Sequence, residues 1–342
     1  MNRNWTRRSL MAAGAAVSLG GCASHQAERP VIGGVRRIRP ELDALVAADA
    51  KVEQLGDGFI WAEGPCWVRG QRFLLFSDVP GDTMYKWTPG EGVRPYLHPS
   101  GYAGPPTDTI REGGSNGLTY DYSGAVILCD SGNRCVSRFN PLSKRRTVLV
   151  DHYQGKRFNS PNDAIVHRNG AIYFTDPPYG LAGIQDSPLR EMNFAGVYRL
   201  DPHGAITLLD DSMAFPNGIS LSPDQKKLYV SCSDPAHPII KVYDLDDNGM
   251  PTASRIFFNA APLMGPDIPG LPDGMTIDST GNLFASGPGG IMVLTPDAVL
   301  LGIIQAPGHP IANCEFGEDG RTLFLTSEHR LACIRTIAHG ID

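Results

Sequence analysis

The sequence of 342 residues lacks features that mark several large classes of protein. Long helical periodicity is absent, apart from the stretch between Pro40 and Asp49, which argues against helix bundles and α/β folds. The apolar run from Leu10 to Leu19 is too short to cross a bilayer as a helix. Basic residues do not dominate, since 30 Lys and Arg face 36 Asp and Glu. A nucleic-acid partner is therefore not expected.

Two common catalytic motifs are missing as well. No Gly-x-Ser-x-Gly elbow is present to supply a serine nucleophile. The glycine-rich segment GPGG at 287–290 lacks the Gly-Lys-Ser/Thr of a phosphate-binding loop and is interpreted as a turn. The histidines at His152, His167, His237 and His309 have no metal-ligand spacing. Only His309 is expected near the site predicted below, and an ordinary loop histidine is the favoured interpretation even there.

The N-terminal residues predict export. Arg7 and Arg8 precede the apolar run, and Leu19-Gly20-Gly21-Cys22 follows it. The arginine pair resembles a twin-arginine leader, and the small residues before Cys22 resemble a bacterial lipobox; an ordinary signal peptide is the alternative. We expect residues 1–21 to be an export signal. The mature chain would begin at a lipidated Cys22 and face the periplasm in a bacterial cell envelope, with a formal charge of −9 instead of −6 after three arginines are lost.

Residues 22–50 are interpreted as a tether and N-terminal segment, and residues 51–340 as one catalytic domain, because no later segment has linker composition. Six further cysteines follow Cys22: Cys66, Cys129, Cys135, Cys232, Cys314 and Cys333. Twin-arginine cargo folds in a reducing compartment, and several of these cysteines lie in apolar runs, so buried free thiols are favoured. A disulfide between Cys129 and Cys135 is the alternative.

One pattern recurs along the chain: a small polar pair, a short alternating strand, a turn with Gly or Asp, and an apolar strand. The copies begin at Glu63, Asn116, Asn162, Asn217, Asp273 and Asn313. Their starts lie 40 to 56 residues apart, the length of propeller blades. With 39 glycines and 28 prolines to form turns, the pattern predicts an all-β, six-bladed β-propeller. The strand around Val52 to Leu55 is expected to join the last blade and close the ring.

The innermost strand of each blade begins near the central channel, so the six polar residues are expected to form a ring there. One such residue is usually a turn cap, but six in register favour a shared polar site. Carboxylate and amide oxygens suit a hard divalent cation, calcium above all, with manganese or zinc as alternatives. We expect Glu63, Asn162, Asn217 and Asp273 to be the metal ligands. A zinc cage of Cys or His is less favoured, because the ring supplies neither in quantity.

At these positions the chain resembles the senescence marker protein/gluconolactonase/luciferin-regenerating enzyme family over roughly residues 55–335. The matching motifs include AEGPCW at 62–67, SNGLTYD at 115–121, NSPNDAIV at 159–166, YFTDPPYG at 173–180, FPNGISLSPD at 215–224, LPDGMTID at 271–278 and ANCEFGEDGRTLFLT at 312–326. The resemblance implies a divalent metal held by Glu63, Asn217 and Asp273, with Asp273 also the general base, and Asn162 reaching substrate. Ser160 stands where animal members carry Arg, so the chain is similar to bacterial gluconolactonases instead.

The predicted activity is metal-dependent hydrolysis of a gluconolactone-like sugar lactone to the aldonic acid. The cation would polarise the carbonyl, and Asp273 would accept the proton of the attacking water. Asn116, Asn162 and Glu112 are expected to bind the substrate. Two alternatives remain: an esterase, organophosphatase or other lactonase on the same scaffold, and a non-catalytic binding propeller in the envelope. Hydroxyl-binding groups at the channel mouth would favour a sugar, and an aromatic wall would favour aryl substrates.

Overall fold

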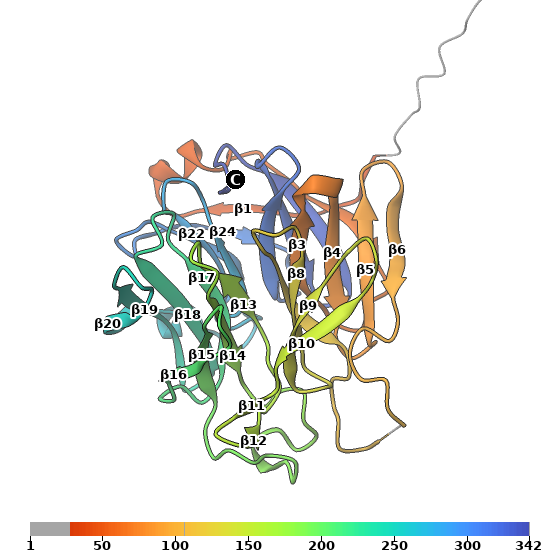
Figure 1. The fold of residues 1–342 in the computed structure, drawn as a ribbon. Helices are drawn as coiled ribbons and strands as arrows, with labels where there is room; N and C mark the ends of the chain where they lie inside the picture. Colours follow the sequence, from red (N-terminus) through yellow and green to blue (C-terminus); the bar gives the residue numbers. More distant parts are fainter. Residues whose placement is uncertain (1–27, 106, 342) are drawn as a thin grey trace, which may run out of the picture.

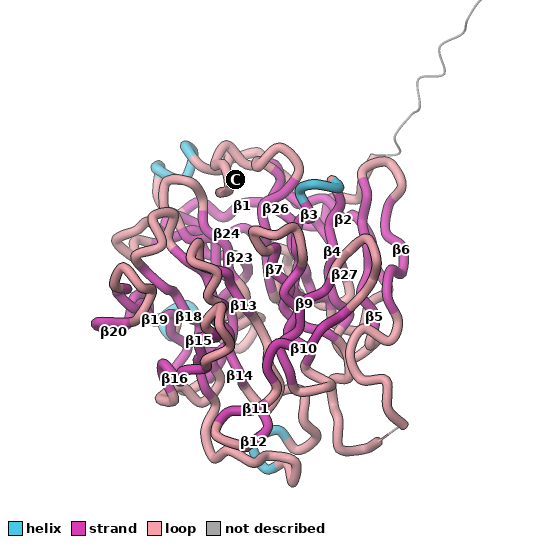
Figure 2. The backbone as a smooth tube through the Cα atoms, in the orientation of Figure 1, coloured by secondary structure: helices cyan, strands magenta, loops and turns pink. Residues whose placement is uncertain are grey.

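The computed structural model describes residues 28–105 and 107–341, so the expected signal peptide and Cys22 lie outside the described residues. The described chain forms antiparallel sheets arranged around a common axis, as Figure 1 shows. Strands dominate, and the short 3₁₀ helices lie in the connections between them (Figure 2). The predicted all-β, six-bladed propeller is confirmed.

The first three blades each contain four strands in chain order from the axis outward. Blade 1 has β3 (Ala62–Val68), β4 (Phe73–Asp78), β5 (Thr83–Thr88) and β6 (Gly92–Leu97). Blade 2 has β7 (Ser115–Tyr120), β8 (Val126–Asp130), β9 (Cys135–Phe139) and β10 (Arg146–Val150). Blade 3 has β13 (Ala164–Val166), β14 (Ile172–Asp176), β15 (Gly196–Leu200) and β16 (Ile206–Asp210).

The last three blades follow the same order, except that the outermost strand of blade 6 comes from the N-terminal side of the chain. Blade 4 has β17 (Pro216–Leu221), β18 (Lys227–Asp234), β19 (His237–Leu245) and β20 (Pro251–Asn259). Blade 5 has β21 (Met275–Ile277), β22 (Leu283–Gly287), β23 (Gly290–Leu294) and β24 (Leu300–Gln305). Blade 6 has β25 (Asn313–Gly317), β26 (Thr322–Ser327), β27 (Arg330–Arg335) and β2 (Val52–Asp57).

The propeller closes where the sequence predicts it. Strand β2 pairs antiparallel with β27, and Glu53 lies opposite Cys333. The six innermost strands contact one another in the cyclic order β3, β7, β13, β17, β21, β25 and back to β3. Because the two ends of the chain share one blade, opening the ring would require this blade to come apart.

The N-terminal segment is built into the propeller. Strand β1 (Val31–Arg37) pairs with both β2 and β24, so it connects the outer edges of blades 5 and 6. The helical pattern after Pro40 forms only a short 3₁₀ helix, η1 (Pro40–Ala44), whose Leu42 is buried. The remaining short elements are β11 (His152–Tyr153), β12 (Lys156–Arg157), η2 (Arg69–Gln71), η3 (Ile184–Asp186) and η4 (Ala261–Leu263).

The hydrophobic core is divided into clusters that lie between neighbouring blades. At the closing junction, Trp67 of blade 1 stacks on Phe324 of blade 6 with ring centroids 5.7 Å apart. Equivalent clusters lie at the other junctions, and the one between blades 5 and 6 includes Leu42 and Val46. Each fully buried large side chain contributes about 1.5–3 kcal/mol, so the blades are held rigidly around the channel.

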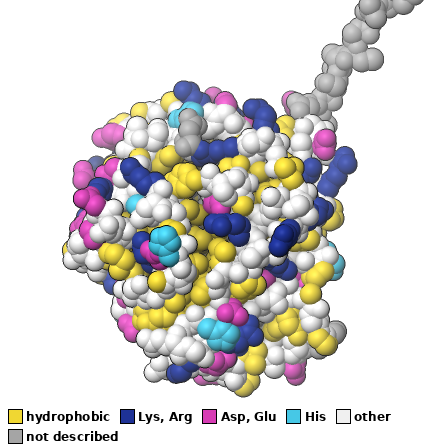
Figure 3. Space-filling view, in the orientation of Figure 1, with side chains coloured by type: hydrophobic (Ala, Val, Ile, Leu, Met, Phe, Trp, Pro, Cys, Tyr) yellow, Lys and Arg dark blue, Asp and Glu magenta, His cyan; other side chains and the backbone are white. Residues whose placement is uncertain are grey.

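All six cysteines among the described residues are free and buried, as favoured above. The alternative Cys129–Cys135 disulfide is wrong, because Cys129 lies opposite Val136 in the hairpin and Cys135 lies opposite Asp130. Within the described ranges, no helix is long and apolar enough to span a membrane. On the face in Figure 3, basic and acidic side chains are interspersed among apolar ones, which agrees with a surface that carries no strong basic field.

Candidate functional site

A cavity of about 680 Å³ opens at the end of the channel where the innermost strands begin. Five of the six predicted ring residues line it: Glu63, Asn116, Asn162, Asn217 and Asp273. They come from five different blades, each at the start of its innermost strand or just before it. The volume lies within the range of small-molecule sites. The register of the repeat therefore produces one shared polar site rather than separate turn caps.

In four of the six blades the residue after the ring residue is a glycine, which allows the neighbouring blades to approach closely. A Cβ on Gly64 would lie 2.1 Å from the carbonyl oxygen of Asn116 in the next blade, so only glycine fits. In blade 3 the second position is Asp163 instead. Its Oδ1 would lie 2.4 Å from a Cβ on Gly117, and its carboxylate accepts hydrogen bonds from the N–H groups of Ala164 at 2.9 Å and Ile219 at 3.3 Å. Asp163, next to Asn162, therefore contacts blades 2, 3 and 4 at once.

The sixth ring residue, Asn313, behaves differently from the expectation. It is not among the residues that line the cavity. Its Nδ2 donates a hydrogen bond to Glu63 Oε2 at 3.3 Å, and its Oδ1 accepts one from the Cys314 N–H at 2.8 Å. Both polar ends of the Asn313 amide are used in this way, so the residue orients Glu63 from behind the cavity wall.

The acids of the channel are crowded and poorly solvated. Burial raises the pKa of Glu63 to about 7, although hydrogen bonds from the Gly64 N–H and Asn313 lower it in part. Burial, with a smaller contribution from the neighbouring Glu63, raises the pKa of Asp163 to about 8. The pKa of Asp273 is raised by burial and then by Glu63 and Asp163. Three carboxyl groups that destabilise one another's ionised forms would be stabilised by a positive charge between them.

The donor set in the channel fits a hard divalent cation. Asn217 donates from Nδ2 to Ser233 Oγ at 2.8 Å, which leaves its Oδ1 to face the cavity. Ser233 in turn donates to the carbonyl oxygen of Pro272 at 2.6 Å, so the Asn217 amide is held in this orientation. The carboxylates of Glu63 and Asp273 and the amide oxygens of Asn162 and Asn217 are the ligand types that calcium prefers. No nitrogen or sulfur ligand faces the cavity from the described ring positions.

Glu112 adds another carboxylate at the edge of the cavity. Its Oε1 lies 2.8 Å from Arg111 Nη1, and Arg111 also donates to the carbonyl oxygen of Tyr179 at 2.9 Å. Burial raises the pKa of Glu112 to about 7, while the charge of Arg111 lowers it in part. The loop that carries Glu112 is therefore tied to the loop after β14.

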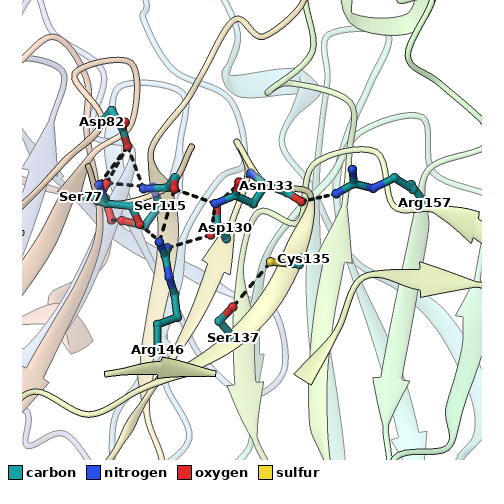
Figure 4. A network of polar contacts seen from close by, with 11 residues as sticks. Ser77, Asp82, Ser115, Asp130, Asn133, Cys135, Ser137, Arg146 and Arg157 are labelled. Atoms are coloured by element: carbon teal, nitrogen blue, oxygen red, sulfur yellow. Dashed lines mark hydrogen bonds and ion pairs between the residues drawn. The ribbon is translucent and has the colours of Figure 1, made fainter. Parts of the chain in front are cut away.

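A polar network at the base of this loop holds it in place, as Figure 4 shows. Asp82 accepts hydrogen bonds from the N–H groups of Ser100 and Gly101 at 3.0 and 2.7 Å. Arg146 donates to Asp130 at 2.8 Å and to the carbonyl oxygen of Ser100 at 2.6 Å. The network joins blades 1 and 2 to the start of the loop, so Glu112 is presented by a supported segment.

One wall of the cavity is aromatic. Tyr179 stacks on Phe215 with ring centroids 5.3 Å apart and planes 13° apart, and both rings line the cavity. Trp61 and Ile60 line it from the segment before β3. This wall was not predicted from the sequence, although Tyr179 belongs to the motif YFTDPPYG. The cavity thus combines amide and carboxylate groups with an aromatic wall.

Residues 61–329 match the family described as the SMP-30/Gluconolactonase/LRE-like region. The chain belongs to this family. A gluconolactonase from Zymomonas mobilis is 47% identical over 90% of this chain and 88% of its own length. The pentonolactonase XacC from Haloferax volcanii is 26% identical over 78% of this chain and 80% of its own. The resemblance found in the motifs is therefore confirmed.

One solved structure gives the same family assignment, and a more distant one shares the fold. A gluconolactonase from Xanthomonas campestris superposes with a TM-score of 0.76 at 32% identity, over 91% of this chain and 99% of that chain. A regucalcin from Agrobacterium tumefaciens, described as a calcium-binding protein, superposes with a TM-score of 0.65 at 16% identity over 84% of this chain and 94% of that chain. The second likeness shows the fold alone.

In this member of the SMP-30/gluconolactonase family, all four expected ligands and both further substrate residues, Asn116 and Glu112, line one cavity. His309 lies beside the rim, since its neighbour Pro310 lines the cavity. It is more than an isolated loop histidine, because the fold brings it to Glu328 and His329. Spacing along the chain does not reveal this group.

Proposed function

We propose that this chain hydrolyses a gluconolactone-like sugar lactone to the aldonic acid, with the help of a divalent cation. The observation that carries the proposal is the cavity in which two carboxylates and three amides from five blades converge. The relatives support lactone hydrolysis, since they include a gluconolactonase and a pentonolactonase. Lactone hydrolysis makes the chain a carboxylic ester hydrolase.

Glu63, Asn162, Asn217 and Asp273 would hold the cation, and calcium is favoured because every expected ligand is an oxygen. When bound, such a cation supplies Lewis-acid polarisation of the lactone carbonyl. Asn313 keeps the Glu63 carboxylate aimed into the cavity through its hydrogen bond at 3.3 Å. Ser233 keeps the Asn217 oxygen aimed the same way.

Asp273 is the proposed general base. It is partly accessible from the cavity, whereas Glu63 is 5% exposed and already accepts two hydrogen bonds. A water beside Asp273 can therefore transfer its proton to a carboxylate that solvent and substrate can reach. Asn116, Asn162 and Glu112 offer amide and carboxylate groups to the sugar hydroxyls, and the aromatic wall offers a face for the apolar side of the ring.

The aromatic wall also favours a second candidate, an esterase or lactonase for aryl or other apolar substrates. The stacked pair of Tyr179 and Phe215 would serve such a substrate as well as it would serve a sugar ring. Fold and metal alone do not choose between the two substrate classes.

A substrate panel tests the proposal. Purified protein with added calcium is given glucono-δ-lactone, phenyl acetate and an organophosphate triester, with acid release followed by pH-stat and corrected for spontaneous opening. We expect the sugar lactone to give the highest kcat/KM. Faster hydrolysis of phenyl acetate would show that the protein is an esterase for aryl substrates instead. Binding of gluconate by calorimetry without turnover of any substrate would assign a binding propeller.

The same proposal covers the place of the protein in the cell. Residues 1–21 would direct twin-arginine export, Cys22 would carry the lipid, residues 22–50 would form the N-terminal segment, and residues 51–340 the propeller. Metabolic labelling with a palmitate analogue tests this in cells. We expect label in the wild type and none in Cys22→Ala; equal labelling of both would contradict the lipid anchor.

A further inference from the structure

A group of two histidines and one glutamate lies on blade 6 beside the cavity, and we refer to His309, Glu328 and His329 as the rim cluster. Its ligand-type atoms lie within 4.8 Å of one another. Nδ1 of His309 is 2.8 Å from Glu328 Oε2, and Nδ1 of His329 is 3.6 Å from the same oxygen. The two imidazole rings meet edge to face with centroids 5.1 Å apart. None of the three residues lines the channel cavity.

The backbones that carry the rim cluster are fixed to one another independently of the three side chains. Ser327 Oγ donates to the carbonyl oxygen of Pro310 at 2.7 Å, and the Ala312 N–H donates to the carbonyl oxygen of Thr326 at 2.8 Å. These bonds join the loop that contains His309 to the turn between β26 and β27 that contains Glu328 and His329. The backbone positions of the three residues are therefore fixed relative to one another even when no ligand is bound.

Two distances in the rim cluster are close to those of a tetrahedral metal site. With zinc bonds of about 2.0–2.2 Å to nitrogen and oxygen, two ligands of a tetrahedral site lie roughly 3.3 Å apart. The observed 2.8 and 3.6 Å fall on either side of this value. Small side-chain rotations would make room for an ion, and the half-exposed rings leave solvent free to reach it.

We propose that the rim cluster binds one Zn²⁺ or a similar borderline divalent ion, separately from the oxygen-lined site in the channel. Two imidazole nitrogens and one carboxylate are a common three-ligand set for zinc, with water in the fourth position. Imidazole suits zinc, nickel and copper, whereas calcium prefers oxygen ligands. The two sites of this chain therefore select different metals.

The proposed site would also brace the rim of the cavity. The backbone carbonyl oxygen of Glu328 accepts a hydrogen bond from the Ala62 N–H at 2.6 Å, and that of His329 accepts one from the Gly58 N–H at 3.0 Å. Between these two amides lie Ile60 and Trp61, which line the cavity. Zinc on the rim cluster would fix the turn and so restrict the segment that carries this part of the wall.

The test is a zinc titration of metal-stripped protein in excess calcium, which occupies oxygen sites without competing for imidazole. A chromophoric zinc chelator reports free Zn²⁺. We expect one tight equivalent in the wild type, and affinity at least about tenfold weaker in His309→Gln and in His329→Gln, because each loses a ligand. His237→Gln is the matched control, since His237 pairs with Asp234 at 3.4 Å without a second histidine.

Two further readouts distinguish a zinc site from a simple histidine–glutamate hydrogen bond. Co²⁺ in place of Zn²⁺ should give the visible absorption of a four-coordinate ion in the wild type and lose it in both rim variants. Zinc should slow amide hydrogen exchange in residues 57–62 and 327–330. Absence of a tight equivalent in the wild type, or equal zinc binding by the wild type and a His309→Gln/His329→Gln double variant, would overturn the proposal. Thermal unfolding checks that all variants are folded.

Discussion

The channel ring and the rim cluster lie close together in the molecule but differ in burial and ligand chemistry. Four of the ring residues, Glu63, Asn116, Asn162 and Asn217, are only 5 to 6% exposed and offer oxygen atoms. The side chains of the rim cluster are 27 to 39% exposed and offer two nitrogens and one carboxylate. The ring is thus suited to a hard cation and a polar substrate, and the rim to a borderline metal. Closeness in the fold does not make them one site.

The two regions should differ most in how a substitution changes lactone turnover, and Asp273→Asn in the ring should have the largest effect. The amide cannot accept the proton of the attacking water, so we expect kcat for glucono-δ-lactone to fall about 10³-fold, within the range for lost general-base catalysis. Circular dichroism should remain unchanged. His237→Gln is the control, because His237 neither lines the cavity nor belongs to the rim cluster. Retained turnover in Asp273→Asn would contradict its role as the general base. An equal loss of kcat in His309→Gln would show that the rim cluster also takes part in hydrolysis.

The close packing of the ring can be tested with glycine substitutions. Gly64→Ala places a Cβ 2.1 Å from the backbone of blade 2 at a φ of +53°, so we expect a loss of roughly 3 kcal/mol or more in unfolding free energy. Gly204→Ala is the matched control, because Gly204 has a φ of +92° with no atom within 4 Å. It should cost only about 1 kcal/mol. Urea unfolding measures both, and equal costs would contradict the packing argument.

The buried carboxyl of Glu112 should make the stability of the protein depend on pH. Its pKa is raised from 4.5 in the unfolded chain to about 7 in the fold, so the folded state binds more protons between these values and loses stability as pH rises through them. Glu112→Gln removes this ionisation. We expect the variant to gain up to about 3 kcal/mol relative to the wild type between pH 4.5 and pH 8. Thermal unfolding across this pH range measures the gain, and parallel curves would refute it.

The smallest expected effect concerns the residue behind the ring. Asn313→Ala removes the hydrogen bond that orients Glu63, so we expect affinity for the channel cation to fall about tenfold. Calcium titration by calorimetry measures this. Asn259→Ala, at the outer end of blade 4, is the matched control. Unchanged calcium affinity in Asn313→Ala would show that Glu63 is oriented without it.

The ring was predictable from sequence because each member occupies the same place in a repeat. Once the copies from Glu63 to Asn313 are aligned, the topology alone places them at the channel mouth. What spacing could not show is the direction of each side chain. Asn313 does not line the cavity, and both ends of its amide are used by Glu63 and the Cys314 N–H.

The rim cluster and the aromatic wall could not be predicted in this way. His309 and His329 belong to a loop and a turn whose closeness depends on hairpin pairing in blade 6. Tyr179 and Phe215 stack across two different blades. The strand β1 was missed because a short segment at an outer edge has neither the repeat pattern nor a long alternating run.

The central claim is that the channel ring performs lactone hydrolysis with a divalent cation. The most direct measurement is pH-stat hydrolysis of glucono-δ-lactone by protein stripped with a chelator, then restored with calcium, manganese or zinc one at a time. We predict that turnover is lost on stripping and returns with calcium, in the wild type and in His329→Gln alike. Full turnover by stripped protein, with no change when any metal is added, would contradict the claim.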